Sequence, residues 1–232
     1  MRDEAKPATE RADRILDAAG ALLLRLGYRK VTIEDIAKQA DIGKGTVYLH
    51  WRTKDQLFSA LMLRESISLL EELLDRLRDD PAEIIPHRFV RASFLATLRR
   101  PLLVAVLTGD TELLGKLKDG PLRSQEVLAN ERYYDLMTRH RLLRDDVPNL
   151  VYAMQAAAAG FYLIDNLDPD ARKLDRQAKA DALAHTLRHA FEPDAAPDPT
   201  AVTTSAAALS AVFEDLIASY HKWIYSQVPE SG

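Results

Sequence analysis

The 232-residue sequence predicts an all-α fold, and three observations lead to this prediction. Apolar residues recur every three or four positions along most of the chain, as on helices that bury one face. Glycine and proline interrupt these stripes at points such as Gly27 and Pro81, where helices would end. Thr32 and Thr53 each precede a stripe and have an Asp or Gln three residues later, which is the spacing of a capping box.

The composition is that of a normal soluble globular protein, with 47% hydrophobic and 28% charged residues. The chain has no cysteine, which excludes disulfides and thiolate sites. No apolar run approaches the length of a membrane span and no signal peptide is visible, so we expect no membrane partner and a cytoplasmic location. Residues 1–55 carry 11 Lys/Arg and 9 Asp/Glu, whereas the other residues carry 20 and 26. The N-terminal part is therefore better suited to a polyanion.

The first predicted helix runs from Thr9 to Leu26. Its apolar positions form an unbroken stripe, and Gly27 is a suitable residue to follow its last turn. We expect this stripe to pack over two short helices that come next in the chain.

Residues 32–54 carry the pattern of a helix-turn-helix. Thr32 is the predicted N-cap of its first helix, with Asp35 as the capping-box partner. The predicted turn is Asp41-Ile42-Gly43, in which Gly43 tolerates a positive φ. Ile42 would fill the angle between the two helices.

The second helix of this pattern, Lys44 to Leu49, is under two turns long and would be marginal on its own. We therefore expect Val47 and Leu49 to hold it against its neighbours. Its other side chains carry hydrogen-bond donors and no acid, which suits phosphates and base edges. Gly45 leaves room for DNA to approach, and Lys54 begins the next helix, whose N-terminal N–H groups attract phosphate. The candidate DNA-binding residues are Thr32, Lys44, Gly45, Thr46, Tyr48, His50 and Lys54.

The run GYRKVTIEDIAKQADIGKGTVYLHWRTKDQLF, residues 27–58, resembles the DNA-binding domain of TetR-family transcriptional regulators. The matching features are the Gly-Tyr before the Thr-capped helix, the I-A-x-x-A core, the G-x-G-T-V-Y-x-H helix and the K-x-x-L that opens the fourth helix. Trp51 stands where the family usually has Phe. The resemblance implies an all-helical homodimer that represses transcription from a double-stranded DNA operator and releases it when a small-molecule effector binds. The competing interpretation of such a motif alone is a purely structural corner.

A larger helical region follows the helix-turn-helix. The first of its helices starts at Lys54 and continues for about 25 residues to Asp79. The stripes and breaks then predict helices over 86–99, 102–107, 122–143, 148–167 and 171–191. In the family the last two pair with their symmetry mates in the dimer. We therefore divide the chain into a DNA-binding domain at 1–53, a ligand-binding and dimerisation domain at 54–192, and an additional segment at 193–232.

The effector site is weakly specified, because pockets in helical domains are lined by the same apolar residues that build a core. Plain core packing is the competing interpretation for every candidate. The effector itself should be lipophilic or aromatic, which rests on the family and on the lining. The candidate pocket residues are Phe94, Leu98, Leu103, Leu107, Tyr133, Tyr134, Met137, Tyr152 and Phe161.

The additional segment begins with a Pro-rich linker, residues 192–200, of polyproline II type. It continues with an amphipathic helix from Thr204 to about Gln227. This helix is too apolar to stay in water, so it must dock either on its own subunit or on the partner subunit of a dimer.

Enzymatic patterns are absent from the sequence. There is no nucleophile elbow, dinucleotide-binding glycine pattern or cysteine nucleophile, so we predict no catalytic residues and no cofactor. His185 and His189 have a zinc-compatible spacing, but the Glu of a metalloprotease motif is missing and we predict no metal. The alternative function is a helical protein–protein adaptor of the same fold that lacks the ligand response.

Overall fold

The computed structural model describes residues 5–115 and 122–226. These residues form helices joined by turns and loops, without strands, which confirms the predicted all-α class. The elements are α1 (Ala5–Leu26), α2 (Ile33–Gln39), α3 (Lys44–His50), α4 (Lys54–Asp79), η1 (Pro81–Ile84), α5 (Pro86–Leu98), α6 (Pro101–Thr108), α7 (Thr111–Leu114), α8 (Leu122–Arg139), α9 (Leu150–Leu167), η3 (Ala171–Lys173), α10 (Arg176–Phe191) and α11 (Pro199–Tyr225).

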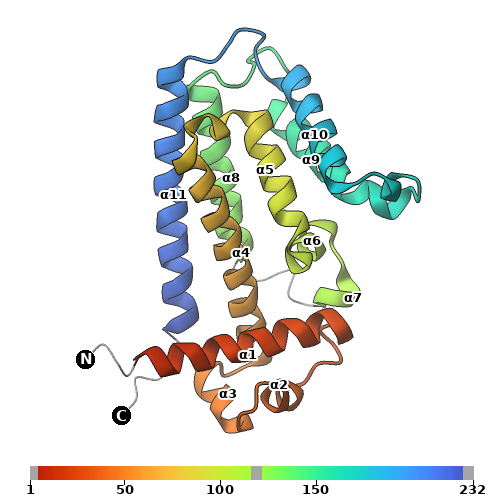
Figure 1. The fold of residues 1–232 in the computed structure, drawn as a ribbon, viewed down its shortest axis with the longest axis vertical. Helices are drawn as coiled ribbons and strands as arrows, with labels where there is room; N and C mark the ends of the chain where they lie inside the picture. The colour runs from red at the N-terminus through yellow and green to blue at the C-terminus, as the bar shows by residue number, and fades with distance from the viewer. Residues whose placement is uncertain (1–4, 116–121, 227–232) are drawn as a thin grey trace.

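Helices α1, α2 and α3 lie at one end of the molecule, where α1 runs across the ends of the long helices (Figure 1). Helix α4 rises from this end into the body, and α11 runs beside it over most of its length. Helices α5 and α8 lie next to this pair. Helices α9 and α10 lie on the far side of α5 from α11.

Two clusters of buried side chains form the core. The first joins α1, α2 and α3 to the N-terminal half of α4, to α6 and to the end of α11. The second lies in the body, between the C-terminal half of α4 and helices α5, α8, α9, α10 and α11. Helices α4 and α11 contribute to both clusters, so they connect the small helical end to the body.

Helix α11 docks on its own subunit, which settles the alternative that the sequence left open. Leu209 and Phe213 are buried in the second cluster, whereas Tyr220 and Ile224 are buried in the first. By length and composition α11 is apolar enough to cross a membrane, so the expectation that no stretch approaches a span was wrong. It packs lengthwise on α4, and 33% of its most apolar stretch is buried.

Several helix ends differ from the predicted ones for local reasons. Helix α8 ends at Arg139 rather than near Leu143, because Arg141 takes a positive φ of 55° and the Leu142 N–H bonds back to Met137 O at 2.9 Å. Helix α10 begins at Arg176 rather than at residue 171, because Asp175 caps it through a 2.8 Å bond from the Ala178 N–H.

Candidate nucleic-acid interface

The start of α2 has the predicted capping box. The Asp35 N–H donates to Thr32 Oγ1 at 3.2 Å, and the Thr32 N–H donates to Asp35 Oδ2 at 3.0 Å. Hydrogen bonds to its carboxylate from the Thr32 hydroxyl and from the Thr32 N–H hold the pKa of Asp35 below its ordinary value. Thr32 remains exposed at this end of the helix, although its hydroxyl donates to Asp35 at 2.6 Å.

The turn between α2 and α3 differs in one respect from the prediction. The positive φ belongs to Asp41, at 54°, whereas Gly43 is extended with a φ of −71°. Asp tolerates the left-handed region better than most residues, which is why it can replace glycine there. The Ile42 N–H bonds to Ala37 O at 3.0 Å and closes the turn, and the Ile42 side chain packs against the first core cluster as expected.

The inner side of α3 holds the helix in place. Val47 and the following Trp51 are fully buried, and His50 is only 3% exposed. Leu49, which we expected to face inward, is 61% exposed, so that prediction was wrong. The chain buries His50 in its place, and this burial lowers the pKa of His50.

The outer side of α3 is a polar, accessible surface. Lys44, Gly45 and Tyr48 are exposed next to one another in the helix, and Thr46 is partly exposed. A Cβ built on Gly45 would meet no atom within 4 Å, so a flat or convex surface can approach the backbone there. Lys44 forms an exposed ion pair with Glu34 of α2 at 3.5 Å. Sequence reasoning missed Glu34 as this competing anion.

Lys54 occupies a different position from the other candidates. It begins α4 beside a capping box between Thr53 and Gln56, which the structure confirms. Its ammonium group donates to Tyr28 O and lies 4.2 Å from the centroid of the Tyr28 ring. Partial burial lowers the pKa of Lys54. The Tyr28 hydroxyl in turn donates to Asp55, so Tyr28 holds the start of α4, a role that sequence reasoning missed.

The candidate effector residues do not lie in one kind of environment. Leu107 and Tyr152 are 54% and 75% exposed, so they face away from the core. Phe94, Leu103, Tyr133 and Met137 are buried, and Leu98, Tyr134 and Phe161 are partly buried. Of these seven buried and partly buried residues, Leu103 belongs to the first core cluster. The other six belong to the second cluster or pack against it.

Aromatic rings of α5 pack against rings of α9 and, at another point of the helix, against a ring of α8. Phe94 lies 4.8 Å from Tyr162 and 6.4 Å from Phe161 between ring centroids, and Tyr133 stacks on Phe89 at 4.9 Å. Burial raises the pKa of Tyr133 well above its ordinary value and that of Tyr162 to about 12. The Tyr133 hydroxyl is buried without a hydrogen-bond partner among the described residues. It is therefore a polar atom that a bound molecule could satisfy.

A metal site would need several His, Cys, Asp or Glu side chains close together. His185 and His189 lie on the exposed side of α10 with their ring centroids 4.3 Å apart. No third His, Asp or Glu joins them within the described part of the chain to make a group that could hold a metal ion.

A short helix with exposed donors, fixed to a buried core by a helix-turn-helix, is the arrangement of a DNA-binding transcriptional regulator. Residues 15–61 match the model for the bacterial regulatory proteins of the tetR family. Residues 15–61 are thus a DNA-binding domain of the TetR type, which confirms the resemblance seen in the sequence.

The relatives agree with this class. The chain is 30% identical over 90 residues to the uncharacterized HTH-type transcriptional regulator YhgD of Bacillus subtilis (strain 168), a match that covers 38% of the chain and less than half, 45%, of that relative. It is 25% identical over 175 residues to the HTH-type transcriptional regulator TtgR of Pseudomonas putida, covering 72% and 82% of the two chains.

A solved structure supports the fold. The crystal structure of a gamma-butyrolactone receptor (ArpA like protein) matches 88% of this chain and 98% of its own, with a TM-score of 0.50 and 17% identity. The relatives that match are transcriptional regulators, which agrees with the expectation that the chain is not an enzyme.

Proposed function

We propose that the protein is a homodimeric repressor that binds a double-stranded DNA operator through α3 and leaves it when a small, mostly apolar molecule binds the body. The observation that carries this proposal is the outer side of α3. Lys44, Gly45 and Tyr48 are exposed there, while Val47 and Trp51 fix the helix from below. A helix held in this way can enter the major groove as a rigid unit.

Each exposed candidate has a distinct proposed role. Lys44 leaves its exposed partner Glu34 and binds a phosphate instead. Breaking the first pair costs little free energy, because exposed ion pairs are weak. Tyr48 and Thr46 contact base edges or phosphates, and Gly45 allows the close approach. Thr32 offers its hydroxyl at the rim.

Two candidates receive a revised role. His50 is nearly fully buried, so we propose that it packs α3 on the core rather than contacting DNA. The Lys54 ammonium donates to Tyr28 O, so it must leave this oxygen before it can bind a phosphate. We propose that the conformation of the body decides whether it does so.

The dimer is proposed to form through α9 and α10, as the family resemblance implies. Large apolar side chains of α9 remain exposed on a single chain, which is unusual for a monomer. Tyr152 belongs to this set, and we assign it to the dimer contact rather than to the effector site. The exposed apolar residues of α9 are Val151, Tyr152, Leu163, Ile164 and Leu167.

The effector is proposed to bind among the aromatic rings between α5, α8 and α9. Its apolar part would pack on Phe94 and Phe161, and a polar atom would bond the buried Tyr133 hydroxyl. Because the second core cluster includes the C-terminal half of α4, a change there can reach the helix that starts at Lys54. The effector shifts the population between two orientations of the α3 helices in the dimer. We place this regulator in the cytoplasm with its operator.

Selection of genomic DNA fragments by the purified protein tests the proposal. We expect enrichment of an approximately palindromic site with half-sites about 34 Å apart or a multiple of this spacing. Absence of any enriched sequence, together with a monomer in sedimentation at micromolar concentration, would favour the adaptor.

A further inference from the structure

A cavity of about 380 Å³ lies at the end of the body that is opposite the DNA-binding helices. It is open to solvent on one side and is bordered by the loop after α8, the end of α10 and the linker into α11. None of the nine candidate effector residues lines it. Its volume is within the range of sites for small organic molecules. The cavity is therefore a place for a ligand that is separate from the aromatic cluster.

One wall of the cavity is apolar. Ile85, Leu142, Pro193 and Pro197 line it, together with three alanines of the linker and of the first turn of α11. Leu142 is also part of the second core cluster, so this wall is continuous with the packed body. Such a surface suits a short hydrocarbon chain.

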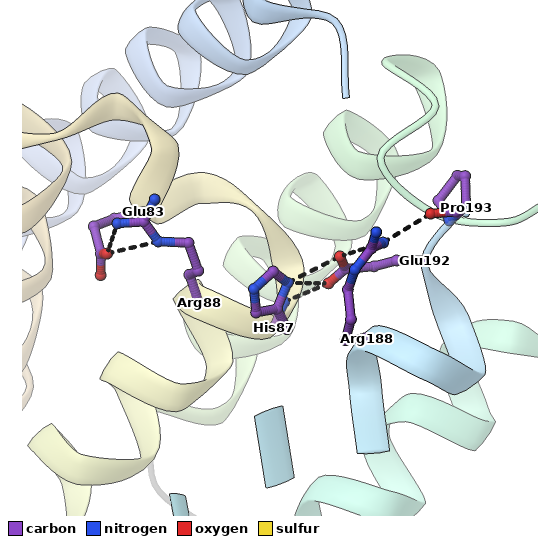
Figure 2. Close-up of polar contacts among 6 residues, drawn as sticks. All are labelled: Glu83, His87, Arg88, Arg188, Glu192 and Pro193. Carbon is purple, nitrogen blue, oxygen red and sulfur yellow. Dashed lines mark hydrogen bonds and ion pairs between the residues drawn. The ribbon is translucent and has the colours of Figure 1, made fainter. Parts of the chain in front are cut away.

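The rest of the lining includes charged residues, and the two carboxylates among them are already satisfied. Glu192 is 4% exposed and accepts hydrogen bonds from the His87 N–H at 2.6 Å and from the His87 ring, whose Nδ1 lies 2.9 Å away (Figure 2). Arg188 lies 3.3 Å from Glu192 and donates to Pro193 O at 2.7 Å. Asp198, the other acidic lining residue, caps α11 by accepting from the Thr200 N–H at 3.0 Å.

Arg141 is the charged lining residue whose guanidinium has no such partner within the described parts of the chain. It sits in the left-handed region, with a φ of 55°, immediately after α8. This backbone conformation, which an arginine rarely adopts, ends the helix, and Arg141, an exposed residue, is one of those that line the cavity. An unpaired guanidinium beside an apolar wall is a fork of donors that fits a carboxylate.

We propose that this cavity is a second ligand site, which binds a small carboxylate with a short apolar tail. The carboxylate forms a bidentate pair with Arg141, and Arg188 supplies further attraction. The tail lies against Ile85, Leu142 and Pro197. The bound molecule contacts both the linker and the residues that follow α8, and so it holds these two segments together.

Helix α11 connects this site to the DNA-binding end. The linker that lines the cavity leads directly into α11, whose last turn reaches α1. There the Tyr225 hydroxyl donates to Asp13 Oδ1 at 2.7 Å, and Ile224 is fully buried in the first core cluster. A ligand that fixes the start of α11 therefore acts on the position of α1 without passing through the aromatic cluster.

Calorimetric titration of the full-length protein with hexanoate tests the site, with the neutral hexanamide as the comparison probe. We expect one hexanoate per chain and at least tenfold weaker binding of hexanamide. Arg141→Ala should weaken hexanoate binding at least tenfold. The matched control is Arg132→Ala, which removes an exposed arginine of α8, and it should bind hexanoate like the original protein.

The outcomes separate this site from the aromatic cluster. If Arg141→Ala leaves hexanoate binding unchanged, or if hexanoate does not bind, the proposal is refuted. If Tyr133→Phe abolishes hexanoate binding while Arg141→Ala does not, the probe binds the aromatic cluster and the proposal is equally refuted.

The connection through α11 has its own test, which rests on the proposed DNA binding. Hexanoate should change operator affinity at least threefold in the original protein and less in Tyr225→Phe, which lacks the bond to Asp13. Binding of hexanoate without a change in operator affinity would refute the connection but not the site. Failure to find any operator would contradict the proposed function and leave the binding result standing.

Discussion

Two long helices, α4 and α11, join the body to the DNA-binding end, and they do so in different ways. Helix α4 starts there, directly after α3, and its Lys54 and Phe58 contact Tyr28 in the loop after α1. Helix α11 ends there and is joined by packing and by the bond from Tyr225 to Asp13. The first is a covalent continuation of the helix-turn-helix, whereas the second is attached only by contacts.

This difference indicates how each helix can act on α3. A displacement of α4 moves its own first turn, which follows α3 directly and is held by the contact between Lys54 and Tyr28. A displacement of α11 instead moves α1 near Asp13, and Arg64 of α4 shares this region through a 2.8 Å pair with Asp17. The helix-turn-helix is thus held from two sides.

The largest effect is expected from removing α11, that is, residues 199–232. The deletion removes the buried side chains of Leu209, Phe213, Tyr220 and Ile224 and exposes the residues that they pack on. Burial of each such side chain contributes about 1.5–3 kcal/mol to the free energy of unfolding. This sum is comparable with the whole stability of a domain. We expect the shortened chain to lose its cooperative thermal transition, measured by circular dichroism. A transition at the original temperature would mean that α11 is an appendage.

Single anchors of the two helices should come next. Phe58 of α4 and Ile224 of α11 are both fully buried in the first core cluster. We expect Phe58→Ala to lower the free energy of unfolding by about 3–5 kcal/mol and Ile224→Ala by about 2–5 kcal/mol. Urea titration measures both. If Ile224→Ala lowers the free energy of unfolding by less than about 0.5 kcal/mol, as a surface substitution does, then α11 is not firmly packed there.

A pH-dependent effect is expected from His50, which α3 buries. Burial lowers its pKa below the value of 6.5 for an unfolded chain. The unfolded state therefore binds the proton more readily, and stability falls as the pH decreases below about 6.5 towards the folded pKa. The stability of His50→Gln should depend less on pH between 7 and 5. Equal slopes in the two proteins, measured by urea titration, would contradict the buried position.

The smallest effect is expected from the ion pair that links the two helices. Arg78 of α4 and Glu214 of α11 lie 2.8 Å apart, and both side chains are more than half exposed. Water screens such a pair, so its coupling energy should be about 0–1 kcal/mol in a double-mutant cycle of Arg78→Ala and Glu214→Ala. A coupling energy above 2 kcal/mol would mean that charge, and not apolar packing, joins α4 to α11.

Features set by a few neighbouring residues could be predicted from the sequence. The capping boxes at Thr32 and Thr53 are examples, because each depends on residues within one helical turn. The helix-turn-helix and the long α4 followed from the spacing of apolar residues. The exposed positions of Lys44 and Tyr48 also agree with the expected outward side of α3.

Features set by packing between distant segments could not be predicted in the same way. Both His50 and Leu49 can face inward on so short a helix, and only the surroundings in the folded chain decide that His50 is buried. The positive φ of Asp41 depends on how α2 and α3 meet. The docking of α11 on α4, and with it the cavity beside Arg141, joins segments that are more than forty residues apart.

The central claim is that the outer side of α3 binds DNA, and operator affinity measured by fluorescence anisotropy tests it most directly. We expect Lys44→Ala and Tyr48→Ala each to weaken binding about tenfold or more, at the scale of 1–3 kcal/mol for a specific contact. Their thermal transitions should be unchanged, since both side chains are exposed. The control Lys173→Ala removes an exposed lysine of η3 and should bind as tightly as the original protein. Original affinity in both α3 variants would contradict the account.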